Sequence, residues 1–109
     1  MIVTIFRSRI NSDIDAEYDH LVKSTSELVE TAVGFKSHKM FIAADGERVT
    51  IVEFESEEAQ RSWAISAEHV EARRAGRARL YSEYKIQICD VVRESNFVCK
   101  PAVTGPARP

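Results

Sequence analysis

The chain has 109 residues, a length that suits one small domain. Hydrophobic residues make up 44% and charged residues 29%, a balance typical of a globular protein rather than a disordered one. The net charge of -2 argues against nucleic-acid binding, and no segment is apolar for long enough to cross a bilayer. The first ten residues lack the pattern of a signal peptide, so we expect a cytoplasmic protein.

The N-terminal third of the chain predicts a strand followed by a helix. Residues 2–10 are rich in β-branched side chains and contain no Gly or Pro, which favours a strand. From residue 14 to residue 32 the apolar side chains recur at intervals of three and four, the period of an amphipathic helix. Gly34 follows as the residue expected to end that helix in a left-handed conformation.

The middle of the chain predicts a hairpin. Residues 35–44 and 48–54 both read as strands, and the second of them alternates between two faces. The dipeptide Asp45-Gly46 separates them, and this pair of residues favours a tight turn. We therefore expect the two strands to be antiparallel neighbours.

A second helix and a last strand complete the pattern. Ser56 is a good N-cap, and a helical pattern follows it through Trp63, with a break expected near residues 66–68. A second helical piece is predicted from about residue 67 to residue 80. Residues 84–92 carry the apolar content of a final strand.

The order strand, helix, strand, strand, helix, strand predicts an α+β, ferredoxin-like β-α-β-β-α-β fold. We expect a four-stranded antiparallel sheet with both helices on one face. The strands carry apolar residues on both faces, so a second copy of the sheet is the simplest cover and a homodimer is expected. Residues 1–95 would form this domain, and the proline-containing residues 96–109 would form a flexible or partner-contacting tail.

Cysteine and histidine residues predict neither a disulfide framework nor a metal site. Cys89 and Cys99 are too few for a framework, and Cys89 reads as a small buried hydrophobe within a strand. His20, His38 and His69 lack the spacing of metal ligands. No glycine-rich cofactor loop is present either, so we expect no cofactor and no metal.

Residues spread over most of the chain resemble the antibiotic biosynthesis monooxygenase family of the dimeric α/β-barrel group. The residues that carry this resemblance are Gly34-Phe35, Val49 to Phe54, Ser56 to Ala59, Trp63, His69, Gly76-Arg77, Tyr81 and Tyr84 to Ile88. The resemblance implies a dimer whose sheets form a barrel, with a small-molecule pocket between each sheet and its helices. Many such proteins oxidise polyphenols or quinols with dioxygen and no cofactor, whereas others degrade haem or isomerise small metabolites.

His69 and Trp63 are the candidate catalytic residues. The resemblance places a substrate-contacting polar ring at His69, and a histidine of near-neutral pKa can remove a phenolic proton. Trp63 would wall the pocket, as a Trp does at the matching place in the family's oxygenases. As plainer alternatives, His69 would be a half-exposed helix histidine beside Glu68, and Trp63 would be a core anchor that buries a large area.

Four further residues are candidate substrate-binding groups. The hydroxyl of Tyr81 or Tyr84 would hold a substrate oxygen, and Arg9 would stabilise a developing anion. His38, which lies in the second predicted strand, is the fourth candidate. As alternatives, the tyrosines would close the core edge and Arg9 would form a surface ion pair.

At some positions this chain differs from the family's patterns, and these differences reduce the number of reactions that the resemblance predicts. Haem-degrading relatives carry an Asn late in the first strand and a histidine beyond the place of His69, where this chain has Ser8 and Arg73. Haem degradation is therefore disfavoured. Some polyphenol monooxygenases carry an Asn one helical turn before the Trp, and the matching residue here is Ala59.

The favoured hypothesis is a cofactor-independent monooxygenase that acts on a small phenolic or quinol compound. The alternative is a non-enzymatic, dimeric small-ligand-binding or stress-related module on the same fold. Neither hypothesis involves nucleic acid or a membrane, and they differ in whether His69, Trp63 and a Tyr converge on one open cavity.

Overall fold

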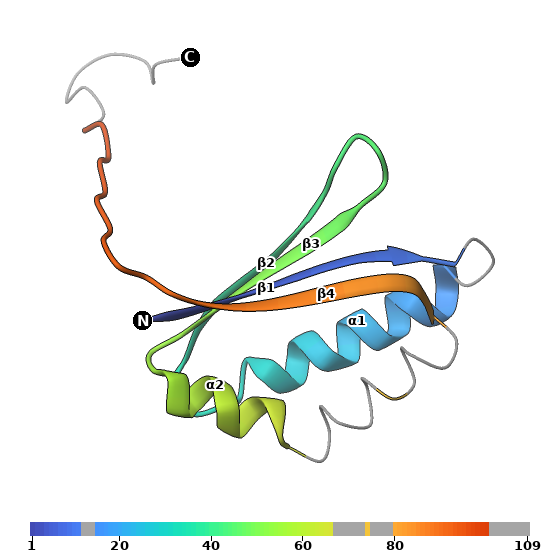
Figure 1. Ribbon diagram of the computed structural model, residues 1–109, viewed down its shortest axis with the longest axis horizontal. Coiled ribbons are helices and arrows are strands. Elements are labelled where there is room, and N and C mark those ends of the chain that lie inside the picture. The colour runs from blue at the N-terminus through green and yellow to red at the C-terminus, as the bar shows by residue number, and fades with distance from the viewer. Residues whose placement is uncertain (12–14, 67–73, 75–79, 101–109) are drawn as a thin grey trace.

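The computed structural model describes residues 1–11, 15–66, 74 and 80–100 and shows a four-stranded sheet with two helices (Figure 1). The elements in chain order are β1 (Ile2–Ile10), α1 (Asp15–Val29), β2 (Phe35–Ile42), β3 (Arg48–Phe54), α2 (Glu57–Ala64) and β4 (Tyr81–Asp90). The sheet has the order β2-β3-β1-β4, and every neighbouring pair is antiparallel. Both helices lie on the same side of the sheet, so the predicted ferredoxin-like fold is confirmed (Figure 1).

Strand register divides the side chains of the sheet between two faces. Phe6 lies opposite Thr50 on β3 and Ile86 on β4, and these three side chains face the helices. The next residue back along β1, Ile5, lies opposite Ile51, and both project from the other face because strand side chains alternate. We call these sides the helix face and the outer face.

Phe54, with 1% of its surface exposed, is the most deeply buried large side chain of the described core. It lies where β3 ends beneath the start of α2, opposite Ile2 of β1. Gly34 reaches the same region with a φ of +82°, and a Cβ on it would lie 2.5 Å from the Cβ of Ala59. The segment between α1 and β2 therefore packs directly against α2, which only glycine permits at this position.

The ends of β4 differ from the sequence prediction. The strand begins at Tyr81 rather than residue 84 and ends at Asp90 rather than residue 92. Its partner β1 sets these limits, because pairing runs from Ile2 opposite Asp90 to Ile10 opposite Tyr81. β2 likewise ends at Ile42, two residues early, because the turn of the hairpin takes up residues 43 and 44.

The end of α1 also differs from the prediction. The helix ends at Val29 rather than at residue 32. The N–H groups of Thr31 and Ala32 donate to carbonyls three residues earlier, at 3.1 and 3.0 Å, so the chain tightens into turns before Gly34. The left-handed conformation predicted for Gly34 is confirmed, although it ends these turns and not the helix itself.

The predicted N-cap of α2 is confirmed. The Oγ of Ser56 accepts a hydrogen bond of 3.1 Å from the N–H of Ala59. α2 ends at Ala64 with Ile65 as its C-cap, close to the break expected at residues 66–68. The second helical piece predicted up to residue 80 falls almost wholly outside the described residues.

Residues 91–100 extend away from the body of the molecule after β4 (Figure 1). The N–H of Val91 donates to the carbonyl of Met1 at 3.1 Å, which ties the start of this segment to the N-terminus. Beyond it, Val92, Phe97 and Val98 are 88%, 86% and 76% exposed. The predicted tail begins within this segment, and its last nine residues lie outside the described part of the chain.

Candidate functional site

A cavity of about 410 Å³ lies between the helix face of the sheet and the two helices. Small-molecule sites typically have volumes of about 300 to 1,000 Å³. The described residues that line it are Thr4, Phe6, Leu21, Val22, Thr25, Ser26, Val29, His38, Thr50, Val52, Phe54, Gln60, Trp63, Ala64, Tyr81, Tyr84, Ile86 and Ile88. No Asp, Glu, Lys or Arg is among these described residues, so the cavity suits an uncharged and largely apolar ligand.

Three aromatic rings form part of the sheet wall of the cavity. The ring centre of Phe6 lies 5.4 Å from that of Tyr81 and 5.6 Å from that of Tyr84, and the two tyrosine rings are 5.8 Å apart. These separations are typical of favourable aromatic pairs. β1 and β4 are adjacent strands, so their pairing brings the two candidate tyrosines together with Phe6 on one wall.

α2 supplies the facing wall through residues that share one side of the helix. Gln60, Trp63 and Ala64 are spaced by three and four positions and all line the cavity. Trp63 is half-buried. The candidate Trp63 therefore lies at the cavity, opposite a wall that carries Phe6.

His38 is the histidine that the described residues bring to the cavity. It projects from β2 beside Phe35, whose ring centre is 5.8 Å away. Its Nδ1 lies 3.9 Å from an Oε atom of Glu30, within range of an ion pair when the imidazole is protonated. Glu30 follows α1 directly, so this contact joins the end of α1 to the β2 wall.

Arg9 lies away from the cavity, on the outer face. Its guanidinium donates to a carboxylate oxygen of Asp45 at 2.8 Å and forms an ion pair with Glu83 at 3.2 Å. The hydrogen bond with Asp45 is the main cause that raises the pKa of Arg9, and the same bond lowers the pKa of Asp45. The structure thus brings four of the six candidates, Trp63, Tyr81, Tyr84 and His38, to one cavity, and it places Arg9 elsewhere.

His69, the sixth candidate, lies outside the described residues, as does Arg73. Ser8, at the place where haem-degrading relatives have an Asn, is 2% exposed on β1. Ala59, which stands where some relatives have an Asn, packs against Gly34.

Five polar residues of the cavity were not among the sequence candidates: Thr4, Thr25, Ser26, Thr50 and Gln60. Thr4 lines it from β1, and Gln60, which is 7% exposed, lines it from α2. The spacing of Gln60 and Trp63, one helical turn apart, was a usable signal for Gln60. Nothing in the local sequence distinguishes Thr4, because its place depends on the pairing of β1 with two other strands.

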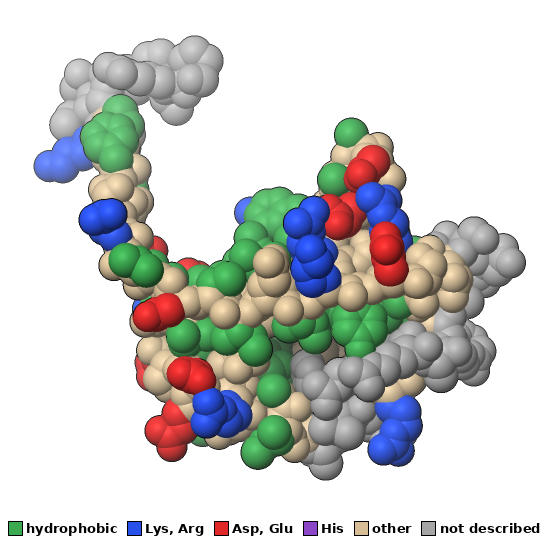
Figure 2. All heavy atoms as spheres, in the orientation of Figure 1, with side chains coloured by type: hydrophobic (Ala, Val, Ile, Leu, Met, Phe, Trp, Pro, Cys, Tyr) green, Lys and Arg blue, Asp and Glu red, His purple; other side chains and the backbone are tan. Residues whose placement is uncertain are grey.

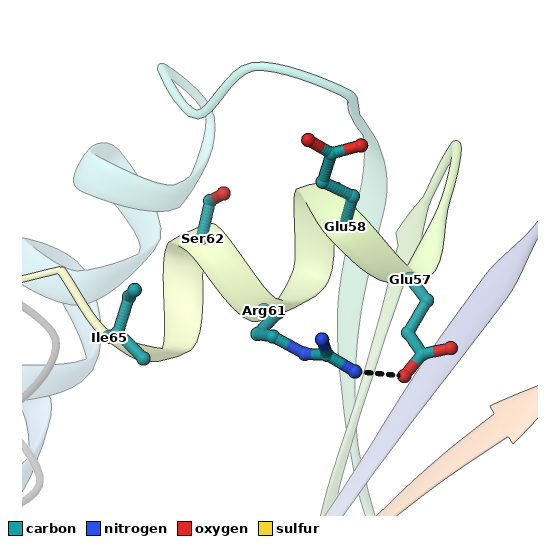
Figure 3. Close-up of a pocket in the computed structure, with 5 residues that line it drawn as sticks. All are labelled: Glu57, Glu58, Arg61, Ser62 and Ile65. Carbon is teal, nitrogen blue, oxygen red and sulfur yellow. Dashed lines mark hydrogen bonds and ion pairs between the residues drawn. The ribbon is translucent and has the colours of Figure 1, made fainter.

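A second hollow of about 470 Å³ lies on the surface of α2 and is shown in Figure 3. The described residues that line it are Glu57, Glu58, Arg61, Ser62 and Ile65, all from α2 or its C-cap. Arg61 pairs with Glu57 one turn earlier, as the dashed line shows (Figure 3). A hollow lined by one helix cannot enclose a ligand, so we take the cavity beneath the helices as the candidate site despite its smaller volume.

The described residues form neither a cluster of metal ligands nor a membrane-spanning helix. Among the described residues, no group of three His, Cys, Asp or Glu side chains is placed to hold a metal ion. No described helix combines the length and the apolar content that crossing a membrane requires. Cys89 is half-buried and Cys99 is exposed, and both are free thiols.

Comparisons with known proteins support the fold. The chain matches no protein-family model. It is 27% identical over 90 residues to the uncharacterized protein YqjZ of Bacillus subtilis (strain 168), an alignment that covers 83% of this chain and 79% of that protein.

Solved structures match more completely. Rv0793 of Mycobacterium tuberculosis has a TM-score of 0.78 at 18% identity, covering 87% of this chain and 98% of the other. A Deinococcus radiodurans protein provisionally named an antibiotic biosynthesis monooxygenase has a TM-score of 0.80 at 11% identity, covering 91% and 100%. The chain has the fold of the antibiotic biosynthesis monooxygenases. SnoaB of Streptomyces nogalater, a cofactor-independent oxygenase with this fold, has a TM-score of 0.73 at 17% identity, covering 85% and 94%.

Proposed function

We propose that the chain is a cofactor-independent monooxygenase that oxidises a small, uncharged phenol or quinol in the cavity beneath its helices. The observation that carries this proposal is the aromatic and uncharged lining of that cavity, with Trp63 on one wall and Tyr81 and Tyr84 on the other. The likeness of the fold to that of SnoaB supports the same class of reaction.

The reaction needs no external reductant when the substrate is oxidised to a quinone. A base removes the phenolic proton, and the electron-rich ring then reduces dioxygen. One oxygen atom becomes the new carbonyl of the ring, and the other leaves as water with the two hydrogens that the substrate loses. An apolar wall suits this chemistry because it excludes bulk water from the reactive intermediate.

His69 is the proposed base, because the resemblance implies a substrate-contacting ring there and an imidazole can accept a phenolic proton. His38 is a second histidine with access to the cavity, and its Nδ1 lies 3.9 Å from a carboxylate oxygen of Glu30. The hydroxyl of Tyr81 or Tyr84 would hold the substrate oxygen. Arg9 has no part in this scheme, because its guanidinium is engaged on the outer face.

Oxygen uptake by the purified chain, measured across a panel of hydroquinones, anthrones and naphthols, tests the proposal. We expect uptake well above buffer for one class, and a loss of about 10²- to 10⁴-fold in His69→Ala if His69 is the general base. His38→Ala is run in parallel to separate the two histidines. His20→Ala, at an exposed position on α1, is the matched control and should keep the wild-type rate.

Absence of uptake across the whole panel would contradict the proposed oxidation. A wild-type rate in His69→Ala would contradict the role given to His69. The second candidate, a ligand-binding module without chemistry, is favoured by the cavity's lack of Asp, Glu, Lys and Arg among its described lining residues. Tight binding of a phenol without oxygen uptake would support that candidate.

We also propose that two copies of the chain pair through the outer face. That face carries apolar side chains on neighbouring strands, with Ile5 opposite Ile51 and with Phe41, 47% exposed, opposite Val49, flanked by the polar side chains of Lys39 and Gln87. Burying this surface against an identical sheet would stabilise a small domain. A molar mass that stays at the chain's 12.3 kDa in light scattering at high concentration would contradict the pairing.

A further inference from the structure

We propose that Thr4 and Gln60 form a polar end of the cavity and that together they bind the neutral oxygen substituent of an aromatic ligand. Nothing in the comparisons points to either residue. The inference rests on the proposed ligand-binding role of the cavity, but it does not depend on the oxidation step.

Thr4 contributes a buried hydroxyl that has no partner within the described part of the chain. Its Oγ1 is inaccessible to water and has no hydrogen bond among the described residues, although the residue lines the cavity. On either side in the sheet lie Val52 and Ile88, which offer no polar atom from their side chains. Buried hydroxyls are normally hydrogen-bonded, and a rotation about χ1 would turn this one toward a ligand.

Gln60 contributes a buried amide from the opposite wall. The residue is 7% exposed and lines the cavity, and its backbone N–H donates to the carbonyl of Ser56 at 3.2 Å. The side-chain amide can donate two hydrogen bonds and accept two. Its neighbours in the lining on α2, Trp63 and Ala64, are aromatic and apolar.

The fold brings the two groups to the same end of the cavity. α2 begins three residues after Phe54, and it contacts both β1 and β3. Phe54 lies opposite Ile2, so the first turns of α2 cover this end of the sheet. Thr4 is the next residue along β1 that faces the helices.

Ser8 also has a buried hydroxyl without a partner among the described residues, but it does not line the cavity and is left out of the proposal.

A hydroxyl and an amide select a neutral oxygen substituent. Both groups can donate to a quinone carbonyl and accept from a phenol O–H, so they would hold the same substituent before and after oxidation. A carboxylate or phosphate would be rejected, because no described lining residue is a Lys or Arg that would compensate its desolvation.

Equilibrium dialysis under anaerobic conditions tests the proposal with two probes of similar shape. The first is 2-naphthol, and the second is 2-methylnaphthalene, which has a methyl group in place of the hydroxyl. We expect the wild-type chain to bind 2-naphthol about tenfold more tightly, the effect of one net hydrogen bond. Thr4→Val and Gln60→Leu should each lower that ratio by about threefold or more and leave the affinity for 2-methylnaphthalene unchanged or higher.

Ser62→Ala is the control, because Ser62 lies on the side of α2 that lines the surface hollow (Figure 3). It should keep the wild-type ratio. Equal binding of both probes by the wild-type chain, binding of neither, or an unchanged ratio in both variants would overturn the proposal. If the chain binds these ligands but does not oxidise them, 2-naphthol will still bind about tenfold more tightly than 2-methylnaphthalene, and no oxygen uptake will be seen.

Discussion

The two faces of the sheet bury different kinds of groups. On the helix face, Phe54 is almost fully enclosed, and the hydroxyls of Thr4 and Ser8 are buried without partners among the described residues. On the outer face, Phe41 remains half exposed, and the charged groups of one end are paired with one another. The helix face thus holds two buried hydroxyls without partners among the described residues, whereas at the hairpin end of the outer face Arg7 and Arg9 are paired with carboxylates.

The charged end of the outer face lies next to the β2–β3 hairpin. Arg7 donates to Glu47 at 2.9 Å and Arg9 to Asp45 at 2.8 Å, so two arginines of β1 hold the tip of the hairpin. Figure 2 shows acidic and basic side chains close together on the side of the sheet away from the helices, toward this hairpin. These pairs orient the hairpin more than they stabilise the fold, because exposed ion pairs contribute little.

The largest expected difference between the faces concerns two phenylalanines. Phe54→Ala should lower the free energy of unfolding by about 3 to 5 kcal/mol, because it empties a closed site in the core. Phe41→Ala should cost less than about 1.5 kcal/mol within one copy, because its ring is already half exposed. Urea unfolding of both variants measures the two losses in the free energy of unfolding.

A second substitution at Phe41 tests the proposed dimer. Phe41→Lys places a charge at the proposed contact and should reduce the molar mass seen by light scattering to that of one chain. Equal losses of stability in the two alanine variants would show that the faces do not differ as described.

A smaller effect is expected at two glycines with positive φ. Gly34→Ala combines a left-handed backbone with a Cβ 2.5 Å from that of Ala59, and should cost about 2 to 4 kcal/mol. Gly46→Ala has a φ of +91° but meets no atom within 4 Å, so only the backbone cost of about 1 to 2 kcal/mol remains. Thermal unfolding compares them, and a Gly46 variant as unstable as the Gly34 variant would argue against close packing on the helix face.

The smallest effect concerns pH at the charged end of the outer face. The hydrogen bond from Arg7 is the main cause that lowers the pKa of Glu47 below its ordinary value of 4.5. A lowered carboxyl pKa means that the pair stabilises the folded chain above that ordinary value and loses this contribution as the pH falls through the folded-state pKa.

Glu47→Gln should therefore be slightly less stable than the wild type at pH 7 and converge with it in acid. Melting temperatures measured from pH 7 down to pH 3, at low and high salt, check this. The difference should shrink in high salt because the groups are exposed. A gap that widens as the pH falls would contradict the assignment.

Prediction of the site from sequence was partial for a physical reason. The family resemblance singled out Trp63 as a pocket residue, and Tyr81 and Tyr84 were candidates from their place at the last strand, where the fold brings them to Phe6. Local pattern left open whether Arg9 serves the site or forms a surface ion pair, because the carboxylates that pair with it lie 36 and 74 positions away along the chain. The role of His69 stays a prediction.

The sequence by itself determined the order of the elements, the hairpin at Asp45-Gly46 and the N-cap at Ser56. These features follow from interactions within a few residues, which local chemistry controls. Only the tertiary structure decided where β4 begins and ends, which face each strand residue occupies, and that Thr4 shares a cavity with Trp63. Those outcomes depend on register between strands distant in sequence, and a shift of one residue would move every side chain to the other face.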